Sequence, residues 1–412
     1  MIAVLLVCAS VSAAADEVRI NSGDLVLNAN LELAPGTTLA DGVIVMLHGT
    51  LGHKDMEIMS TLQSVFKEYE YSTLAINLSF DVSDRHGFYP CERPHTHEYA
   101  DALSELGLWL KWLKQQNAGD VVMLGHSRGA NQVTNFLLRS GNKISAAILI
   151  APSTGDGSQS TIMKAALDQA KEAEWLDDVD FLHCKSTKVR SKSFLSYYAM
   201  PGQGNTPELL NDIATPALVF SGSQDEVVPD LAEKMENVNN NLVSHMEIHG
   251  ADHFFRDLFA YDVVEASIEF LESVNLIEPA KSLQTDAKVS MDEQRPIIIF
   301  VTQYGCQYCQ LLRQQVLHPM IRGGELNAKA ILREVSLDSG DTITDFSGDL
   351  TSGSIFAARY DAELTPTLLF LDGRGREVSD RIVGISNIEY YGFYLDKAIV
   401  SATSAIAESN QK

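Results

Sequence analysis

The chain has 412 residues, of which 45% are hydrophobic and 21% are charged, and its formal net charge is -24. This length exceeds what one hydrophobic core usually organises, so we expect two domains. The composition excludes a disordered chain, and the acidic excess disfavours nucleic acid and anionic membrane surfaces as partners.

The N-terminus carries a targeting pattern. Residues 2–11 form an apolar run, which small residues and then charged residues follow. This pattern predicts a signal peptide over residues 1–16, too short to span a bilayer as a stable helix. We therefore expect an exported, periplasmic protein without a stable membrane span. No Lys or Arg precedes the run, which leaves the true start codon open.

Four cysteines follow the predicted signal peptide: Cys91, Cys184, Cys306 and Cys309. In an oxidising compartment an even number of cysteines is typical of disulfides. The close pair Cys306 and Cys309 leaves Cys91 and Cys184 for each other, as a possible structural disulfide. Two separate buried thiols are the alternative.

Residues 17–276 alternate short apolar runs with longer helical patterns. This rhythm predicts an α/β domain with a doubly wound, mostly parallel sheet and helices on both of its faces. The expected strands are 43–47, 72–78, 121–124, 146–151, 216–220 and 243–249. The expected helices are 57–69, 96–116, 130–140, 231–238 and 258–274. Residues 152–213 lack a strong strand, which predicts an inserted lid.

The stretch Gly-His-Ser-Arg-Gly, residues 125–129, lies where an expected strand turns into a helix. A nucleophile elbow needs small residues two places before and after its serine, because strand and helix approach closely there. A tight glycine turn that happens to contain serine is the alternative. The stretch His-Gly-Thr-Leu-Gly follows strand 43–47, so the amide of Thr50 or Leu51 and the amide of Arg128 are the expected oxyanion-hole donors.

Two later strands each end in a turn with a candidate partner for Ser127. Asp225 follows strand 216–220, and His253 lies in the loop after strand 243–249. The competing acids are Glu226, Asp230 and Asp252. The competing histidine is His249, which lies within the strand. The chain order Ser127, Asp225, His253 is that of α/β-hydrolases.

Residues 40–275 resemble an α/β-hydrolase of the esterase and lipase type through the motifs HGTLG, GHSRG, SGSQDEVVP and GADHFF. The resemblance implies that Ser127 is the nucleophile, His253 the general base and Asp225 the carboxylate that orients His253. It implies hydrolysis of a small ester or thioester through an acyl-enzyme, without a cofactor. The acyl and leaving groups are not readable from the sequence.

The segment 81–99 follows the second expected strand and should lie on the substrate side of the sheet. Its basic residues are Arg85, His86, Arg93, His95 and His97. They lack a compact metal-ligand spacing, so we expect a solvated polar loop and no metal site.

A second α/β pattern of thioredoxin size covers residues 297–412, after a polar linker at 277–296. The expected strands are 297–302, 331–337, 367–371 and 381–384. The expected helices are 307–316, 355–360 and 389–401. Residues 338–354 look like an insertion loop.

The pair Cys306 and Cys309 forms a C-x-x-C at the start of an expected helix. The helix dipole and free amides there favour a Cys306 thiolate, which makes Cys306 the attacking sulfur and Cys309 the resolving thiol. Half of a zinc site is the alternative, but no second Cys or His pair follows in this domain.

Residues 297–405 resemble a thioredoxin-fold domain through this C-x-x-C, the stretch Leu364-Thr365-Pro366-Thr367 and the hairpin FLDGRGREV. The resemblance implies that Pro366 is cis and lies against the cysteines, and that Thr365 presents its backbone to a protein partner in thiol-disulfide exchange. Tyr304 and the pair Gln307-Tyr308 differ from thioredoxin itself, so the direction of electron flow stays open.

Both patterns together predict an exported serine hydrolase with a C-terminal thiol-disulfide oxidoreductase domain. In the alternative, the hydrolase-like part is a binding or scaffold module and the redox domain carries the only activity. A further hypothesis is that both sites act on one substrate, such as an acylated thiol. A regulatory version has Cys306 and Cys309 reduce a Cys91–Cys184 disulfide and so loosen the lid over Ser127.

Overall fold

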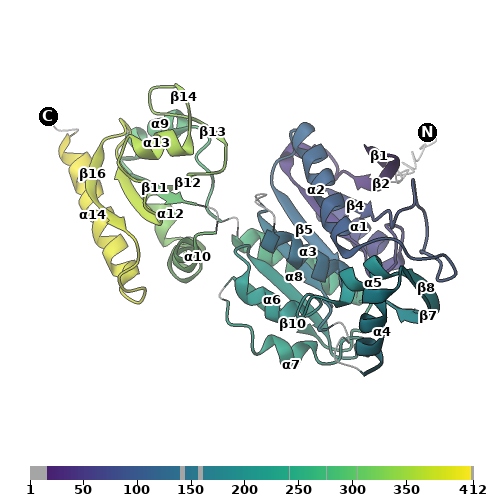
Figure 1. Cartoon of the computed structure of the whole chain (residues 1–412). Coiled ribbons are helices and arrows are strands. Elements are labelled where there is room, and N and C mark those ends of the chain that lie inside the picture. The colour runs from purple at the N-terminus through teal and green to yellow at the C-terminus, as the bar shows by residue number, and fades with distance from the viewer. Residues whose placement is uncertain are drawn as a thin grey trace, which may run out of the picture.

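The computed structural model describes residues 16–139, 144–155, 161–240, 242–274, 276–303 and 305–409, which form two domains (Figure 1). The predicted signal peptide lies outside the described residues, apart from Asp16, which begins the first strand.

The larger domain is built on an eight-stranded sheet in the order β1-β2-β4-β3-β5-β6-β9-β10. The strands are β1 (Asp16–Ser22), β2 (Leu25–Glu32), β3 (Val43–Leu47), β4 (Thr73–Asn77), β5 (Val121–His126), β6 (Ala146–Ile150), β9 (Ala217–Gly222) and β10 (Val243–Ile248). The hairpin β1–β2 joins β4 in antiparallel fashion, and all later neighbours are parallel. The predicted doubly wound, mostly parallel sheet is confirmed, and the hairpin extends it by two strands that the sequence did not indicate.

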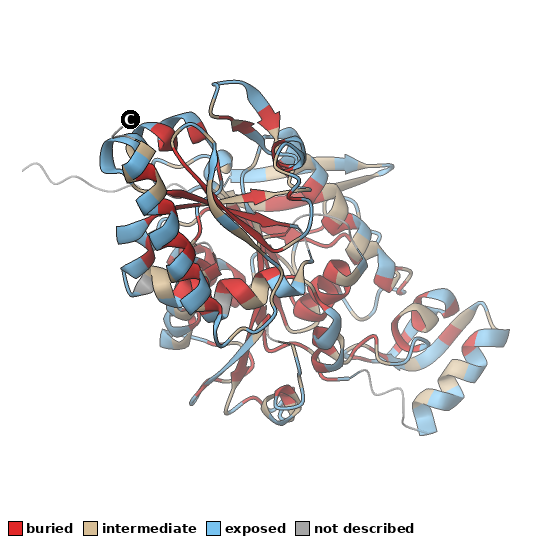
Figure 2. Cartoon of the chain, turned by 90° about the vertical axis from the view of Figure 1, so that its left-hand side faces the viewer, coloured by how far each residue is buried: buried red, intermediate tan, exposed pale blue. Residues whose placement is uncertain are grey.

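Helices cover both faces of this sheet. They are η1 (Leu39–Asp41), α1 (Glu57–Glu68), α2 (Tyr99–Gln115), α3 (Arg128–Arg139), α7 (Leu231–Met235) and α8 (Leu258–Val274). Strands β4 and β5 lie on opposite sides of β3, so right-handed crossovers put α1 on one face and α2 and α3 on the other. Strands β3, β4 and β6 are therefore buried along their whole length. Figure 2 shows buried residues gathered on strands and on the inner sides of helices, with exposed residues on the outer sides. No helix within the described ranges is long and apolar enough to cross a membrane.

The insertion between β6 and β9 contains a hairpin that the sequence did not predict. Its elements are α4 (Thr161–Glu172), β7 (Trp175–Phe181), β8 (Cys184–Arg190), α5 (Ser191–Tyr198), α6 (Thr206–Leu209) and η2 (Leu210–Asp212). Strands β7 and β8 pair with each other and not with the main sheet. Only Cys184, Thr187 and Val189 of β8 are buried, so the strand carries little apolar signal. We call the segment 152–213 the cap.

The smaller domain has a four-stranded sheet in the order β12-β11-β15-β16. Its strands are β11 (Ile297–Thr302), β12 (Ile331–Ser336), β15 (Thr367–Leu371) and β16 (Glu377–Val383). Its helices are α10 (Gln307–Leu312), the π-helix η3 (Arg313–Leu317), α11 (His318–Arg322), α12 (Glu325–Lys329), α13 (Gly353–Ala358) and α14 (Tyr391–Ser409). The expected insertion loop holds the short hairpin β13 (Thr342–Thr344) and β14 (Leu350–Ser352).

The predicted linker at 277–296 is part of the smaller domain. Ile277 is 4% exposed within its core, and α9 (Leu283–Glu293) buries Leu283 and Ala287 against it. The hydroxyl of Ser282 accepts a hydrogen bond from the Thr285 amide and caps α9. The sequence suggested a linker because α9 buries only a narrow apolar stripe and is otherwise polar.

Candidate active sites

Ser127 lies in a sharp turn between β5 and α3, with a φ of 56°. The left-handed conformation strains a residue with a side chain and is typical of a nucleophile elbow. A Cβ at Gly125 would lie 2.5 Å from the Cα of Ala130, and one at Gly129 would lie 2.3 Å from the His48 carbonyl oxygen. Both glycines are therefore required by the close approach of strand and helix.

The structure brings Ser127, His253 and Asp225 into one hydrogen-bonded row. Ser127 Oγ lies 2.9 Å from His253 Nε2, and His253 Nδ1 lies 2.8 Å from Asp225 Oδ2. The competing histidine, His249, is exposed, and its Nδ1 lies 3.4 Å from the hydroxyl of Ser223. Of the candidate bases, His253 is thus the one in contact with Ser127.

Asp225 is held as an acceptor for His253. Its other oxygen, Oδ1, accepts hydrogen bonds from the amides of Val227 at 2.8 Å and Val228 at 3.0 Å. Burial alone would raise the pKa of Asp225, but the hydrogen bonds from His253 and from these amides outweigh it, so the pKa is lowered. The carboxylate therefore stays ionised beside the imidazole.

His126 supports the loop that carries His253, a role that the sequence analysis did not assign. Its Nε2 donates a hydrogen bond of 2.9 Å to the backbone oxygen of His253. Burial, followed by the nearby His253, lowers the pKa of His126 to about 4. His126 is therefore a neutral donor that holds the backbone of His253 in place.

The predicted oxyanion loop follows β3 and lies beside the elbow. A Cβ at Gly49 would lie 3.2 Å from the Cβ of Ser127, so the backbone around Thr50 runs close to the serine. Leu51 has a φ of 49°, which turns the chain sharply after Thr50. Arg128 is the first residue of α3, where amides have no acceptor within the helix. The amides of Thr50, Leu51 and Arg128 thus belong to the two backbone turns that flank Ser127.

Arg85 braces the oxyanion loop from the segment 81–99. Its side chain is 5% exposed, and it donates hydrogen bonds to the carbonyl oxygens of Leu78 at 2.7 Å and Gly52 at 2.8 Å. A third carbonyl acceptor is that of Gly87. The amide of Tyr89 also donates to the Leu51 carbonyl at 3.0 Å. The segment 81–99 therefore fixes the backbone of Leu51 and Gly52 by hydrogen bonds.

Two histidines of the same segment are also buried, so the expectation of a solvated loop is wrong for much of it. His95 and His97 are each 0% exposed. His95 Nδ1 lies 3.2 Å from His97 Nε2, and His97 Nδ1 lies 3.0 Å from the Tyr197 hydroxyl of the cap. Burial lowers the pKa of His97 to about 3, so this pair packs as neutral rings. The sequence carried no signal of this burial, because the cap residues that cover these rings lie about a hundred positions later.

Cys91 and Cys184 form a disulfide that ties this segment to β8 of the cap. Around it, Thr187 donates to the Cys91 carbonyl at 2.7 Å and the Arg190 amide donates to the His95 carbonyl at 2.9 Å. The cap, the segment 81–99 and the oxyanion loop are therefore mechanically connected.

The smaller domain carries the second predicted chemistry. Cys306 and Cys309 form a disulfide at the start of α10, where the Cys309 amide donates to Cys306 Sγ at 3.1 Å. Cys306 is half-buried and Cys309 is 1% exposed, so Cys306 is the more accessible sulfur.

Pro366 follows a cis peptide bond with Thr365. Directly after it, Thr367 of β15 pairs with Val301 of β11, and β11 leads into the loop of Cys306. The Thr365–Pro366 loop and the cysteine loop thus leave the sheet at the same end.

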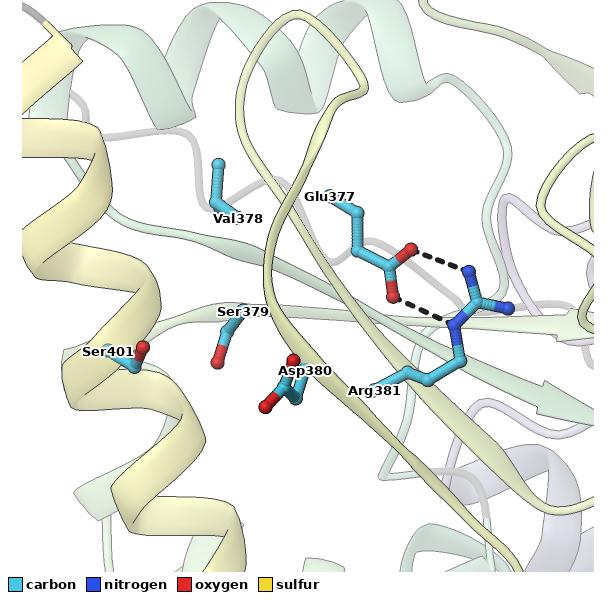
Figure 3. A pocket seen from close by; sticks show the side chains of 6 residues that line it. All are labelled: Glu377, Val378, Ser379, Asp380, Arg381 and Ser401. Atoms are coloured by element: carbon cyan, nitrogen blue, oxygen red, sulfur yellow. Dashed lines mark hydrogen bonds and ion pairs between the residues drawn. The ribbon is translucent and has the colours of Figure 1, made fainter.

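A pocket of the smaller domain lies between β16 and α14 (Figure 3). Its residues are separate in the sequence from those of both predicted sites. It is lined by Glu377, Val378, Ser379, Asp380, Arg381 and Ser401. The Arg381 side chain spans both oxygens of Glu377, at 2.9 and 2.5 Å. Glu377 and Arg381 are thus already paired with each other, and the pocket contains none of the predicted site residues.

Comparison with known proteins agrees with this architecture. The profile of the alpha/beta hydrolase family matches residues 44–266, and that of a thioredoxin-like domain matches residues 283–399. The chain therefore belongs to the alpha/beta hydrolase family and carries a C-terminal thioredoxin-like domain. No curated protein matches it.

Two solved structures are each similar to about 60% of the chain. Est1E from Butyrivibrio proteoclasticus is 18% identical, with a TM-score of 0.46, and the match covers 63% of this chain and 99% of that chain. A monoacylglycerol lipase from Paleococcus ferrophilus is 17% identical, with a TM-score of 0.46, and the match covers 60% of this chain and 99% of that one.

Proposed function

We propose that the larger domain is a serine hydrolase that cleaves an ester or thioester. The observation that carries the proposal is the row of Ser127, His253 and Asp225 at the elbow. Ser127 and the oxyanion loop also lie at the carboxyl ends of β5 and β3, beside the point where the strand order reverses. Open α/β sheets bind ligands at such a point.

In the proposed reaction, Ser127 Oγ attacks the carbonyl carbon while His253 Nε2 takes the serine proton. The amide of Thr50 or Leu51 and the amide of Arg128 stabilise the negative oxygen of the tetrahedral intermediate. His253 then returns the proton to the leaving alcohol or thiol, and an acyl-enzyme remains. Water, deprotonated by His253, attacks this ester and releases the acid and free Ser127.

Hydrolysis of p-nitrophenyl esters of increasing chain length tests the proposal. We expect Ser127→Ala and His253→Gln to lower kcat/KM by about 10⁴-fold or more, because the triad acts as a unit. Ser153→Ala and His249→Gln are matched controls, since both residues follow strands of the same sheet and neither touches Ser127. Equal activity in all four variants would contradict the proposal and favour a binding or scaffold role for this domain.

We further propose that the smaller domain exchanges disulfides with a partner protein, with Cys306 attacking and Cys309 resolving. The half-exposed Cys306 at a helix N-terminus supports this order. Cys309→Ser should trap a mixed disulfide with the partner, and Cys306→Ser should not. A trapped adduct in Cys306→Ser alone would reverse the assignment.

Export to an oxidising compartment is also a proposal, supported by the N-terminal pattern and by the Cys91–Cys184 disulfide. N-terminal sequencing of the protein recovered from a periplasmic fraction tests it. A mature N-terminus near residue 17 is expected, and recovery of the intact chain from the cytoplasm would contradict it.

A further inference from the structure

Arg128 follows Ser127 directly, and its side chain lies between the oxyanion loop and the cap. Its Nε donates a hydrogen bond of 3.2 Å to the Thr50 hydroxyl. Its guanidinium carbon lies 5.9 Å from the centre of the Tyr197 ring, which belongs to the cap. The side chain is half-buried, so it is ordered by these neighbours and still reachable.

Arg128 lacks an acidic partner in the described part of the chain, where no carboxylate oxygen lies within 4.0 Å of it. Arg256 and Arg313, for comparison, pair with Asp252 at 2.5 Å and Glu334 at 2.7 Å. One hydroxyl and one aromatic ring leave the two terminal nitrogens of Arg128 available to a ligand.

His183 of the cap is a second basic group in this neighbourhood. It precedes Cys184, whose disulfide anchors the cap to the segment 81–99. Partial burial and then the charge of Arg128 lower the pKa of His183, so the two side chains lie within electrostatic reach of each other.

We propose that the Arg128 side chain binds a carboxylate of the substrate, so that the enzyme prefers esters or thioesters with an anionic acyl or leaving group. A guanidinium matches a carboxylate with two parallel hydrogen bonds, and a half-buried charge without a partner is stabilised by such a ligand. The negative net charge of the chain repels anions in general. A local cation is therefore needed to hold an anionic substrate beside Ser127. This inference rests on the proposed serine hydrolase.

Matched pairs of esters test the inference. For the acyl side, mono-p-nitrophenyl glutarate is compared with its neutral methyl ester, and for the leaving-group side, 4-acetoxybenzoate is compared with its methyl ester. We expect the full chain to favour one of the anionic members. Arg128→Met should lower that anionic-to-neutral ratio of kcat/KM by about 10- to 100-fold, the usual range for hydrogen bonds to charged groups. Arg128→Lys should retain part of the preference.

The ratio is taken within each variant, so a general loss of activity or folding cancels. Arg139→Met is the control, because Arg139 lies on the same helix and its Nη2 donates to Asn135 Oδ1 at 3.1 Å, far along α3 from Ser127. It should leave the ratio unchanged. If Arg128 only braces the Thr50 loop, both esters lose activity in the same proportion, and that result overturns the inference.

Calorimetric binding of glutarate and 4-hydroxybenzoate separates this inference from the proposed function. If no ester is hydrolysed, the serine hydrolase proposal fails, and the binding experiment still decides the role of Arg128. Binding that Arg128→Met weakens about 10-fold or more supports the inference. The inference is overturned if neither acid binds and no preference for an anionic ester is found. It is also overturned if the wild type and Arg128→Met bind the acids equally well.

Discussion

At the scale of single residues, Asp225 decides which nitrogen of His253 carries a proton. Its Oδ2 lies 2.8 Å from Nδ1, so the proton sits there and Nε2 is left free to accept from Ser127. Asp225→Asn can present its amide to Nδ1 and so favours the wrong tautomer. We expect kcat to fall by about 10⁴-fold with little change in the fold, measured by ester hydrolysis and circular dichroism.

The lowered pKa of Asp225 also predicts a pH dependence of stability. A carboxyl group whose pKa is depressed in the folded state stabilises the fold above its unfolded pKa, and this contribution is lost as the pH falls through the folded pKa. The difference in unfolding free energy between wild type and Asp225→Asn should therefore shrink as the pH drops from about 6 to about 3. Urea titrations at several pH values measure it, and a difference that grows toward acid pH would be inconsistent with this account.

Arg85 offers a test of the brace on the oxyanion loop. Arg85→Met leaves the carbonyls of Leu78 and Gly52 without their buried donor, so the free energy of unfolding should fall by about 2–4 kcal/mol. Ester hydrolysis should fall as well, because Gly52 belongs to the loop of Thr50 and Leu51. Arg93→Met is the control, since Arg93 is an exposed residue of the same segment. A stable, fully active Arg85→Met would remove Arg85 from the positioning of this loop.

At the scale of elements, the approach of β5 and α3 explains the two glycines of the elbow. A Cβ at Gly129 would meet the backbone oxygens of His48 and Leu47 at 2.3 and 2.5 Å, and backbone cannot rotate away as a side chain can. Gly129→Ala should therefore cost at least about 1–3 kcal/mol of unfolding free energy and most of the ester hydrolysis.

Gly107→Ala is the matched control for that substitution. On α2, the nearest atom to a Cβ at Gly107 is Phe136 Cε2 at 4.0 Å, so the methyl group fits. Alanine is the better helix former, which predicts a gain of about 0.5–1 kcal/mol. Thermal unfolding of both variants gives the comparison, and a destabilisation of the same size in both would contradict the steric argument.

Whether a strand could be predicted from the sequence depends on how many of its residues are buried. Strands such as β3 and β11 are buried on both sides, so they read as continuous apolar runs and were predicted with their observed bounds. Strand β1 lies at the edge of the sheet, and β7 and β8 lie in the cap. Each has a solvent-exposed face with polar residues, so none of them forms an apolar run that the sequence analysis could recognise.

Chain order and strand ends pointed to the site residues, because a nucleophile, an acid and a base at strand ends of one parallel sheet gather at one edge. The supporting residues could not be predicted in the same way. His126 and Arg85 act through contacts to backbone atoms that are remote in the sequence, and their own neighbours do not signal these contacts.

At the scale of the whole molecule, the Cys91–Cys184 disulfide links the cap to the brace of the oxyanion loop. It closes a loop with a sequence separation of 93 residues, so its loss should cost about 2–4 kcal/mol of unfolding free energy. The hypothesis that Cys306 and Cys309 reduce it joins the two domains, and the electrons would pass from the dithiol pair to this disulfide.

Reductant sensitivity tests whether the Cys91–Cys184 disulfide supports stability and ester hydrolysis. Dithiothreitol should lower the stability and the ester hydrolysis of the wild type, and it should have no further effect on Cys91→Ala/Cys184→Ala. Cys306→Ala/Cys309→Ala is the control, which should respond to dithiothreitol like the wild type. Mass mapping that finds Cys91 and Cys184 unpaired under oxidising conditions would remove the hypothesis.

Ser127 is the nucleophile of the proposed mechanism, and covalent labelling of its hydroxyl is the decisive experiment. The full chain is treated with a fluorophosphonate and the adduct is located by peptide mass spectrometry, beside Ser127→Ala and His253→Gln. We expect one adduct on Ser127, which is absent from Ser127→Ala and forms far more slowly in His253→Gln. Ester hydrolysis that survives in Ser127→Ala, or an adduct on another residue, would contradict it.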